Sequence, residues 1–493
     1  MHQAEAWATG QLRAVEPLAL EAPWPDAPLT FAPAGHIPSP TVRGAIAPVC
    51  PAGLSLAMVP FVWAGEAGEG SGAGTTGRAN LVFIVVPLFG ALLVWSTYLL
   101  GSRFSTRVGL ASALLVACSP AFLFQLMQPM SDVPAAALWV LTVAYAVSGT
   151  RRSALSAGFA TSAAVVVRPN LLPMGIVFGL FILFRPERSW RERTRDAAKF
   201  AAASLPGCFA VAVIQQMLYG SPLRSGYGSL QGLFVFDHIL PNAIRYATWM
   251  WQSHGFVWLL AFAAPFVLPG WLTTLLLWLV VVNIACYLPY AVFNDWWYVR
   301  FLLPAIAILL VVAMAVVDAL IHLWREPLWF AHGTSHKGLS HRLGVIAIAT
   351  VVCMLFIREA RARNVFDLPR LEARYQRAGV YVDTHLPRDA VMITSWESGS
   401  VRYYGHRKTL VWDALDPAWL DRAIAYVRMR GYEPYLLFER WEEPIFRRRF
   451  IDSAIAKLDW PPAAEIAGQV RIYRPDDRER YLKGVSLPTE YAR

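Results

Sequence analysis

Long apolar segments between residues 79 and 358 dominate the pattern of hydrophobic and polar positions along this chain. Most of them approach the ~20 residues that a helix needs to cross about 30 Å of hydrocarbon. The runs are continuously apolar and do not alternate with a period of two, which favours helices over barrel strands. The pattern therefore predicts a mainly α protein, a polytopic transmembrane helix bundle of about ten spans. We place the spans at residues 80–101, 108–127, 132–149, 153–168, 170–184, 198–218, 255–270, 272–292, 299–323 and 342–358.

Polar regions flank this bundle, which covers residues 79–358. Residues 1–78 include the stretch GEAGEGSGAGTTG, so we expect an external loop segment that is partly flexible. Residues 359–493 alternate short strand patterns with helical ones, which predicts a small external C-terminal α/β domain. This domain has no Gly-rich phosphate loop in its sequence, so nucleotide binding has no support. Within the bundle, residues 219–254 form an external loop whose segment FDHILPNAIRYATWMW predicts an interfacial amphipathic helix.

Basic residues occupy alternate loops between the spans. The positive-inside rule places such loops in the cytoplasm, whereas the opposite loops QPMSD and VRPN carry little positive charge. We therefore expect a multi-pass protein of the bacterial inner (plasma) membrane, with both soluble regions on the external, periplasmic side. The basic loop residues are Arg103, Arg107, Arg151, Arg152, Arg185, Arg188, Arg191, Arg193, Arg195, Lys199, Arg325, Lys337 and Arg342.

The beginning of the chain does not fit this orientation easily. MHQAEAWATGQL has neither the charged region nor the apolar region of a signal peptide, although it is expected outside. We therefore expect a first transmembrane helix upstream of Met1, lost through a misassigned start codon or a truncation. The alternative is that the following helices translocate this segment without a signal.

Composition narrows the function classes further. Of the 493 residues, 56% are hydrophobic and only 16% are charged, against about 25% charged in soluble domains. The net charge of +10 is explained by the cytoplasmic loops, and no basic stripe or module predicts nucleic-acid binding. Four of the five cysteines lie in apolar spans and none forms CxxC, so neither a disulfide framework nor a cysteine metal site is predicted.

Two ionisable residues lie where external loops meet spans, and such positions are candidate functional sites. Asp132 begins a span in MSDVPAAALWVL, where it caps a helix or acts as a catalytic base or cation ligand. Arg168 lies in VRPNLLP, where its side chain reaches the interface or clamps a donor phosphate.

The segment FNDWWYVRFLLP is a third candidate. Arg300 would bind a lipid phosphate there, and the segment would surround a lipid stem or a sugar with Asp295, Trp297 and Tyr298. The alternative is an aromatic belt at the membrane interface with an Asp–Arg ion pair.

The loop 219–254 adds Tyr227 as a further substrate contact. His238 and His254 are candidate metal ligands in the same loop, although a lone histidine is more often structural.

The order of these motifs resembles a known family, the polytopic glycosyltransferases of the C-type fold. That family includes the dolichyl-phosphate-mannose protein mannosyltransferases and the bacterial aminoarabinose lipid A transferases. The resemblance covers about residues 1–360, and its motifs are individually loose. The motifs in order are CPAGLSLAMVPF, MSDVPAAALWVL, VRPNLLP, YGSPLRSGYG and WWYVRFLLPAI.

The resemblance implies an inverting transfer of a sugar from a polyprenyl-phosphate donor, at the external face of a membrane. An external carboxylate would deprotonate the acceptor, which is a lipid, a glycan or a protein. Cationic residues, often with a divalent metal ion, would stabilise the departing lipid phosphate. Asp132 falls where the family has its second acidic residue. The first acidic residue has no counterpart here, because Glu5 and Asp26 do not match its register.

Two alternatives belong to other function classes. A transporter or flippase-like carrier predicts internal repeats and paired charges at mid-bilayer, whereas here the charges lie at external ends of spans. A catalytically inactive membrane assembly protein is the second alternative, because the main acidic residue of the family is missing.

Overall fold

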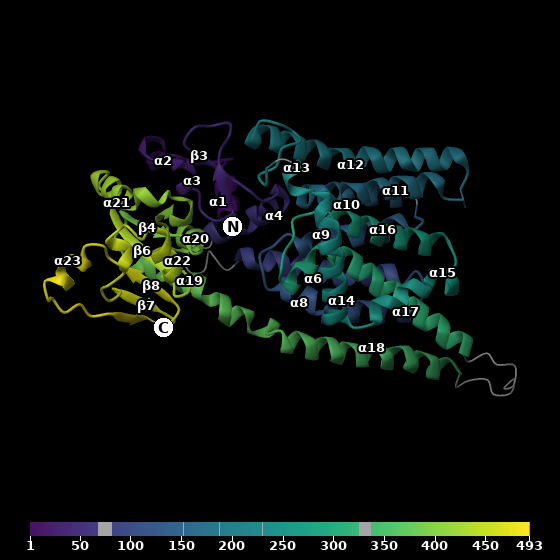
Figure 1. Cartoon of the computed structure of the whole chain (residues 1–493). Helices are drawn as coiled ribbons and strands as arrows, with labels where there is room; N and C mark the ends of the chain where they lie inside the picture. Colours follow the sequence, from purple (N-terminus) through teal and green to yellow (C-terminus); the bar gives the residue numbers. More distant parts are fainter. Residues whose placement is uncertain (68–80, 151, 187, 229, 325–336, 493) are drawn as a thin grey trace.

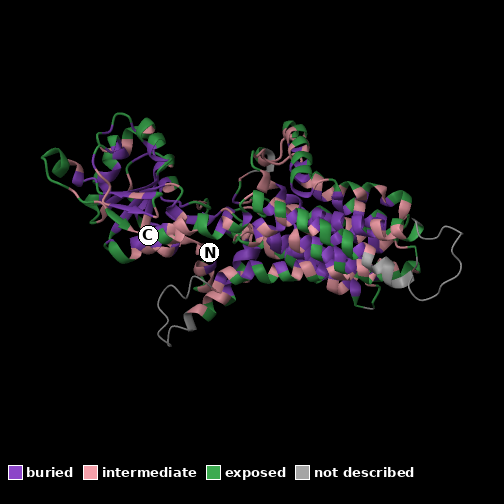
Figure 2. Cartoon of the chain, turned by 90° about the horizontal axis from the view of Figure 1, so that it is seen from below, coloured by how far each residue is buried: buried purple, intermediate pink, exposed green. Residues whose placement is uncertain are grey.

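The computed structural model describes residues 1–493 except 68–80, 151, 187, 229, 325–336 and 493. Figure 1 shows a helical bundle at one end of the molecule and a smaller domain built on a sheet at the other. The long helix α18 (Lys337–Ala362) runs along the bundle and leads into the sheet domain. Figure 2 shows buried residues in the centre of the bundle and across the sheet.

Helix α9 (Asp132–Ala146) lies at the centre of the bundle. All of its residues except Tyr145 are buried, and it packs against α6, α10 and α17. A helix that is apolar on every side is stable only when its neighbours cover it completely. The other principal helices are α6 (Val85–Gly101), α7 (Thr106–Cys118), α10 (Ser153–Val167), α11 (Leu172–Phe184), α12 (Trp190–Tyr219), α16 (Trp271–Tyr287) and α17 (Leu303–Trp324).

Shorter elements connect these helices. The short α-helices are α8 (Pro120–Leu126), α13 (Leu230–Leu233), α14 (Ile239–His254) and α15 (Ala264–Val267). The 3-10 turns are η2 (Val82–Ile84), η3 (Pro169–Leu171), η4 (Phe236–His238), η5 (Val257–Ala263), η6 (Trp296–Leu302) and η7 (Val365–Asp367). The amphipathic helix predicted in the loop 219–254 is present as α14.

The bundle contains fewer full-length spans than the ten that we predicted. Within the described residues, three helices are long and apolar enough to cross a membrane: Val82–Gly101, Trp190–Tyr219 and Trp296–Leu323. A fourth span is possible if α7 and α8 are counted together, although they are bent by 59°. The bend falls before Pro120, because proline lacks the amide hydrogen that would continue the helix. Six further apolar helices have only 10–17 residues.

The N-terminal region is more ordered than predicted. Residues 1–67 form four helices and a small antiparallel sheet of order β1-β3-β2, rather than a loop segment. The predicted flexible stretch lies mostly outside the described residues. The elements of the N-terminal region are α1 (His2–Ala8), β1 (Ala14–Val15), α2 (Pro17–Glu21), α3 (Ala27–Thr30), β2 (His36–Pro38), β3 (Ala45–Pro48) and α4 (Ala52–Ala67).

This N-terminal region joins the bundle to the sheet domain. Helix α4 packs against α10 of the bundle, whereas Trp24 and Phe31 lie in the core of the sheet domain beside Tyr426. The buried carboxylate of Glu16 forms ion pairs with Arg402 at 3.0 Å and with Lys408 at 2.9 Å. Contacts so distant in sequence leave no local pattern, which is why the sequence predicted only a loop.

The predicted C-terminal α/β domain is present. Its sheet has the order β5-β4-β6-β8-β7-β9, with β5, β4 and β6 parallel and β8 antiparallel to β6. The strands are β4 (Ala390–Thr394), β5 (Lys408–Val411), β6 (Glu433–Glu439), β7 (Ala464–Ile466), β8 (Val470–Tyr473) and β9 (Glu490–Ala492). The helices are α19 (Leu368–His385), α20 (Ser398–Tyr404), α21 (Leu420–Met429), α22 (Glu443–Arg449) and α23 (Asp477–Leu482), with short turns η8 (Trp412–Ala414), η9 (Pro417–Trp419) and η10 (Ile455–Lys457).

Candidate functional site

Asp132 forms the centre of a charged cluster at the first turn of α9. Its side chain is 1% exposed, and Oδ1 accepts a hydrogen bond from Arg168 Nη2 at 2.6 Å. Arg300 Nε lies 3.8 Å from the same oxygen. A carboxylate at a helix N-terminus interacts favourably with the helix dipole, but a buried one also needs a cationic partner. Two guanidinium groups therefore share one buried carboxylate and leave the cluster with an excess of positive charge.

Arg168 is held by three side chains. Helix α10 ends at Val167 because Pro169 disfavours a helical conformation at the preceding residue. The Arg168 side chain then turns toward α9, where Nε donates to Ser131 Oγ at 3.2 Å, in addition to its bond with Asp132. Nη1 donates to the hydroxyl of Tyr287 at 2.9 Å. This arrangement fixes the guanidinium plane.

Arg300 belongs to η6, the 3-10 turn before α17. Its Nη1 contacts Met130 Sδ at 3.1 Å, and its guanidinium lies over the ring of Tyr298 at 4.6 Å and of Phe301 at 5.2 Å. Arg300 Nε is buried and makes no hydrogen bond with the described residues. Arg300 is thus held mainly by aromatic faces, and it keeps hydrogen-bonding capacity for a ligand.

The predicted aromatic segment divides between two environments. Tyr298 stacks on Phe293 at 3.9 Å and lies beside Arg300, as expected for a site residue. Trp297 instead stacks on Phe124 at 5.6 Å in a separate apolar cluster, and Asp295 is exposed. The carboxylate near Arg300 is therefore Asp132, and the Asp–Arg pair that we considered within this segment is not formed. Within the described residues, Asp295 and Trp297 make no direct contact with the three charged side chains, although both contact Tyr298.

Tyr227 lies in the loop 219–254, which packs against the N-terminal region. Its hydroxyl is 3.6 Å from Cys50 Sγ, so it contacts the CPAG motif rather than Asp132. Gly226 explains this close approach, because a Cβ there would lie 2.5 Å from Val49 Cα. The loop and the motif are therefore packed backbone against backbone.

The two candidate metal-binding histidines do not form one site. His238 precedes α14 and His254 ends it, so a helix of 16 residues separates them by about 24 Å. His254 is buried, with Nε2 at 2.8 Å from Ser119 Oγ and Nδ1 at 2.7 Å from Ser253 Oγ. Both ring nitrogens of His254 thus have partners within the protein, and the two histidines are too far apart to hold one ion together. A metal role for either histidine stays a prediction.

The charged cluster also does not fit a divalent metal ion. Across the described part of the chain, no group of three or more His, Cys, Asp or Glu side chains is arranged to hold a metal. Asp132 is a single carboxylate between two cations, which is an unfavourable setting for a further cation. The arrangement fits an anion bound to the two arginines better.

Several site residues carried no recognisable signal in the sequence. Ser131, Met130 and Tyr287 orient the arginines, but each is an ordinary residue of a loop or span. Gly53 is another, because a Cβ there would lie 2.5 Å from Val167 Cα, directly before Arg168. Only a glycine allows α4 to approach the end of α10 this closely.

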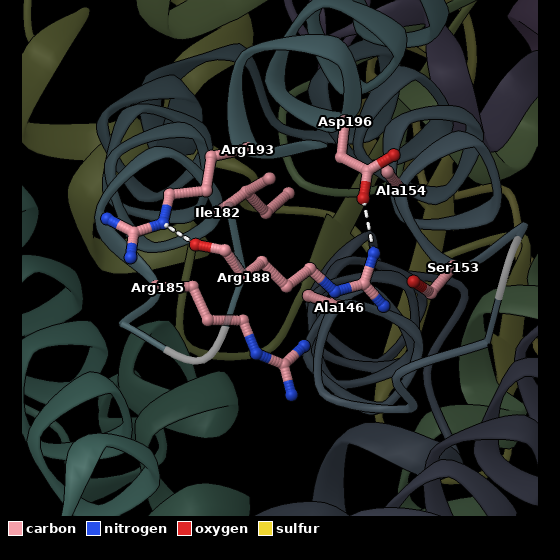
Figure 3. A pocket seen from close by; sticks show the side chains of 8 residues that line it. All are labelled: Ala146, Ser153, Ala154, Ile182, Arg185, Arg188, Arg193 and Asp196. Carbon is pink, nitrogen blue, oxygen red and sulfur yellow. Dashed lines mark hydrogen bonds and ion pairs between the residues drawn. The ribbon is translucent and has the colours of Figure 1, made fainter. Parts of the chain in front are cut away.

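A second basic cluster lies at the opposite end of α11. Figure 3 shows a small pocket that Arg185, Arg188, Arg193 and Asp196 help to line, with the Arg188 guanidinium directed at Asp196. Arg188 Nη1 bonds Asp196 Oδ2 at 2.6 Å, and Arg193 Nε donates to the carbonyl of Arg188 at 2.6 Å. Because α11 separates Arg168 from this cluster, the charged site and the arginine-rich loops lie at opposite ends of the same helix.

Comparisons with known proteins agree with this architecture. Residues 76–214 match the family model described as dolichyl-phosphate-mannose-protein mannosyltransferase, a segment that includes Asp132 and Arg168. No curated protein matches the chain significantly in sequence.

Solved structures are similar over nearly the whole chain. ArnT from Cupriavidus metallidurans bound to undecaprenyl phosphate has a TM-score of 0.56 at 12% identity, covering 96% of this chain and 92% of that chain. The same protein in the apo state gives 0.54 at 12% identity, with 96% and 91% covered. The oligosaccharyltransferase of Archaeoglobus fulgidus, in a complex with Zn and sulfate, gives 0.51 at 13% identity, with 79% and 59% covered. The resemblance seen in the sequence is therefore confirmed, and the chain has the fold of the C-type polytopic glycosyltransferases.

Proposed function

We propose that this protein is a membrane glycosyltransferase that moves a sugar from a polyprenyl-phosphate donor to an acceptor at the external face. The observation that carries the proposal is the pairing of Arg168 and Arg300 around the buried Asp132. The family model over residues 76–214 supports it, as does the shared fold with an ArnT bound to undecaprenyl phosphate.

The chemistry of the donor fits two arginines. When the bond between the anomeric carbon and the phosphate oxygen breaks, its electron pair stays on the lipid phosphate. Guanidinium groups stabilise this charge through bidentate, charge-assisted hydrogen bonds. Arg168 and Arg300 are 14% and 12% exposed, so water competes little for their donors.

We assign Asp132 two tasks in this reaction. Its Oδ1 holds both arginines in position. Its Oδ2 is buried and has no hydrogen-bond partner among the described residues, so it is the oxygen placed to receive the proton of the acceptor hydroxyl. That hydroxyl attacks the anomeric carbon from the face opposite the departing phosphate, which inverts the anomeric configuration.

The location of the site supports the external face of a bacterial inner membrane. The arginine-rich cluster in Figure 3 lies at the far end of α11 from Arg168. Under the positive-inside rule that cluster is cytoplasmic, which leaves Arg168 and the sheet domain in the periplasm. The nature of the sugar and of the acceptor is open.

A transfer assay in membrane vesicles tests the proposal. Vesicles with the full-length protein receive synthetic polyprenyl-phosphate hexoses and pentoses with a labelled sugar, and release of polyprenyl phosphate is measured. We expect release that Arg300→Ala lowers about 10²–10³-fold and that Arg388→Ala, at an exposed arginine of the sheet domain, leaves unchanged. Movement of the intact donor across the bilayer without cleavage would instead identify a carrier and contradict the proposal.

A further inference from the structure

The carboxyl ends of strands β4 and β6 form an edge of the sheet domain that the proposed transfer does not use. Strand β4 continues into α20, whose Val401 packs on the sheet face of Met392. Strand β6 continues into α22, whose Phe446 packs on the opposite face with Phe438. Neighbouring parallel strands whose connections leave on opposite faces create a switch point, and ligands bind outside their carboxyl ends.

This edge of the sheet faces the bundle. The first turns of α19 follow directly on α18 and η7, and there Arg374 Nε lies 3.2 Å from Glu439 Oε1 at the end of β6. The amide of Ala34, in the N-terminal region, donates to Ser398 Oγ at the start of α20 at 3.0 Å. Figure 1 shows α20 and α22 on the side of the domain toward the bundle, with α21 and α23 on the far side.

Two exposed tryptophans stand at the ends of β4 and β6. Trp396 is 57% exposed and Trp441 is 48% exposed, and their rings meet edge to face with centroids 5.7 Å apart. The indole N–H of Trp441 donates to Glu439 Oε2 at 3.0 Å, which fixes its orientation. Large aromatic faces that remain in water at a switch point are available for a ligand.

Buried carboxylates lie directly behind these rings. Glu442 ties the two loops together, because it accepts the amide of Glu439 at 2.8 Å and the amide of Trp396 at 3.4 Å. Glu397 is fully buried and accepts a hydrogen bond from Ser400 through Oε2, but its Oε1 has no partner within the described residues. Burial raises the pKa of Glu397 to about 8 and that of Glu442 to about 7.

We infer that this edge of the sheet binds a carbohydrate, with sugar C–H faces on Trp396 and Trp441 and sugar hydroxyls at the Arg374–Glu439 ion pair beside Trp441. An anionic ligand fits poorly, because Arg374, the arginine at this edge, is already ion-paired with Glu372 and Glu439. Apolar lipid would desolvate that ion pair. Carbohydrate binding by the sheet domain does not depend on the proposed function. Its use to hold a glycosylated acceptor near Arg300 rests on the proposed glycosyl transfer.

A binding experiment without any donor separates the two proposals. The purified full-length protein in nanodiscs is titrated with maltotriose, chitotriose and mannotriose, and saturation-transfer NMR is recorded. We expect saturable binding of at least one trisaccharide. Trp396→Ala should weaken it about tenfold or more, and Trp396→Phe should restore part of the loss, because an aromatic face is worth ~1.4 kcal/mol or more. Tyr491→Ala, an exposed aromatic residue on the edge strand β9, is the control.

Two results would overturn the inference. One is the absence of saturable binding for all three sugars, or binding that the Trp396 and Trp441 variants leave unchanged. The other is quenching by doxyl-labelled phospholipid in the nanodisc that becomes clearly smaller in the Trp396→Phe variant, which would make this edge a membrane contact. Sugar binding by a protein that shows no transfer activity would sustain this inference while contradicting the proposed function.

Discussion

Arg168 and Asp132 are 36 positions apart in the chain, yet Arg168 Nη2 lies 2.6 Å from Asp132 Oδ1 inside the bundle. The pair joins the end of α10 to the start of α9. Because the carboxylate is almost completely buried, each charge depends on the other for stabilisation.

The first prediction concerns the energetic coupling of this pair. Asp132→Asn leaves two buried guanidinium groups without their carboxylate, and Arg168→Gln leaves Asp132 with the more distant Arg300 alone. Each change should therefore lower the melting temperature and cost at most ~3–5 kcal/mol of unfolding free energy. The double variant removes both charges and should lose at least 1 kcal/mol less than the sum of the single losses. Thermal unfolding of the four proteins in detergent measures this, and strictly additive losses would contradict the pairing.

The second prediction concerns Arg300 and the donor phosphate. Arg300→Ala should lower kcat about 10²–10³-fold, because a positioned donor to the departing phosphate is lost. Arg300→Lys should recover only part of this activity, since lysine keeps the charge but lacks the planar fork that stacks on Tyr298. Steady-state kinetics with a polyprenyl-phosphate sugar give the comparison. Full activity of the lysine variant would show that charge alone is required.

The third prediction concerns the close packing of α4 on α10. Gly53→Ala places a Cβ within 2.5 Å of the Val167 backbone, so α4 must move away from the segment that holds Arg168. We expect a lower melting temperature together with reduced transfer. Gly344→Ala in α18 is the matched control, because its Cβ would meet only the Ile321 side chain at 3.8 Å. A helix interior gains from that change by up to ~1 kcal/mol, so the control should be neutral or stabilised.

The fourth prediction concerns pH and the buried carboxylate of Glu397. Its pKa is raised by burial to about 8, so the folded domain keeps a proton that the unfolded chain releases near pH ~4.3. Folded protein therefore binds more protons between these values, and its stability falls as pH rises from about 4.3 to 8. Glu397→Gln should raise the melting temperature at pH 8 and change it little at pH 4. Glu479→Gln, an exposed glutamate, should show neither effect. Equal shifts of the Glu397 variant at both pH values would contradict the raised pKa.

Local patterns predicted much of the architecture correctly. In the sheet domain, the strands β4, β5, β6 and β8 and the helices α20 and α21 follow from short apolar runs and periodic apolar positions, which act over a few residues. The shorter strands β7 and β9 were missed, because three residues carry too little pattern. Among the described residues, fewer helices than the ten predicted spans reach full length, because hydrophobicity alone does not reveal where Pro120 bends a helix or where a 3-10 turn replaces one.

The sequence by itself determined that this chain is a helical membrane bundle with a small α/β domain, and it singled out Asp132, Arg168 and Arg300 as charges at helix ends. Those conclusions rest on composition and spacing, because the preference of a segment for water or for hydrocarbon depends only on residues near each other in the chain. Only the tertiary structure decided that the three charges share one buried cluster, that Asp295 and Trp297 lie outside it, and that His238 and His254 are too far apart for one ion. It also brought Trp396 and Trp441 together. Such contacts depend on how separate elements pack, because burial and distance are properties of the assembled chain.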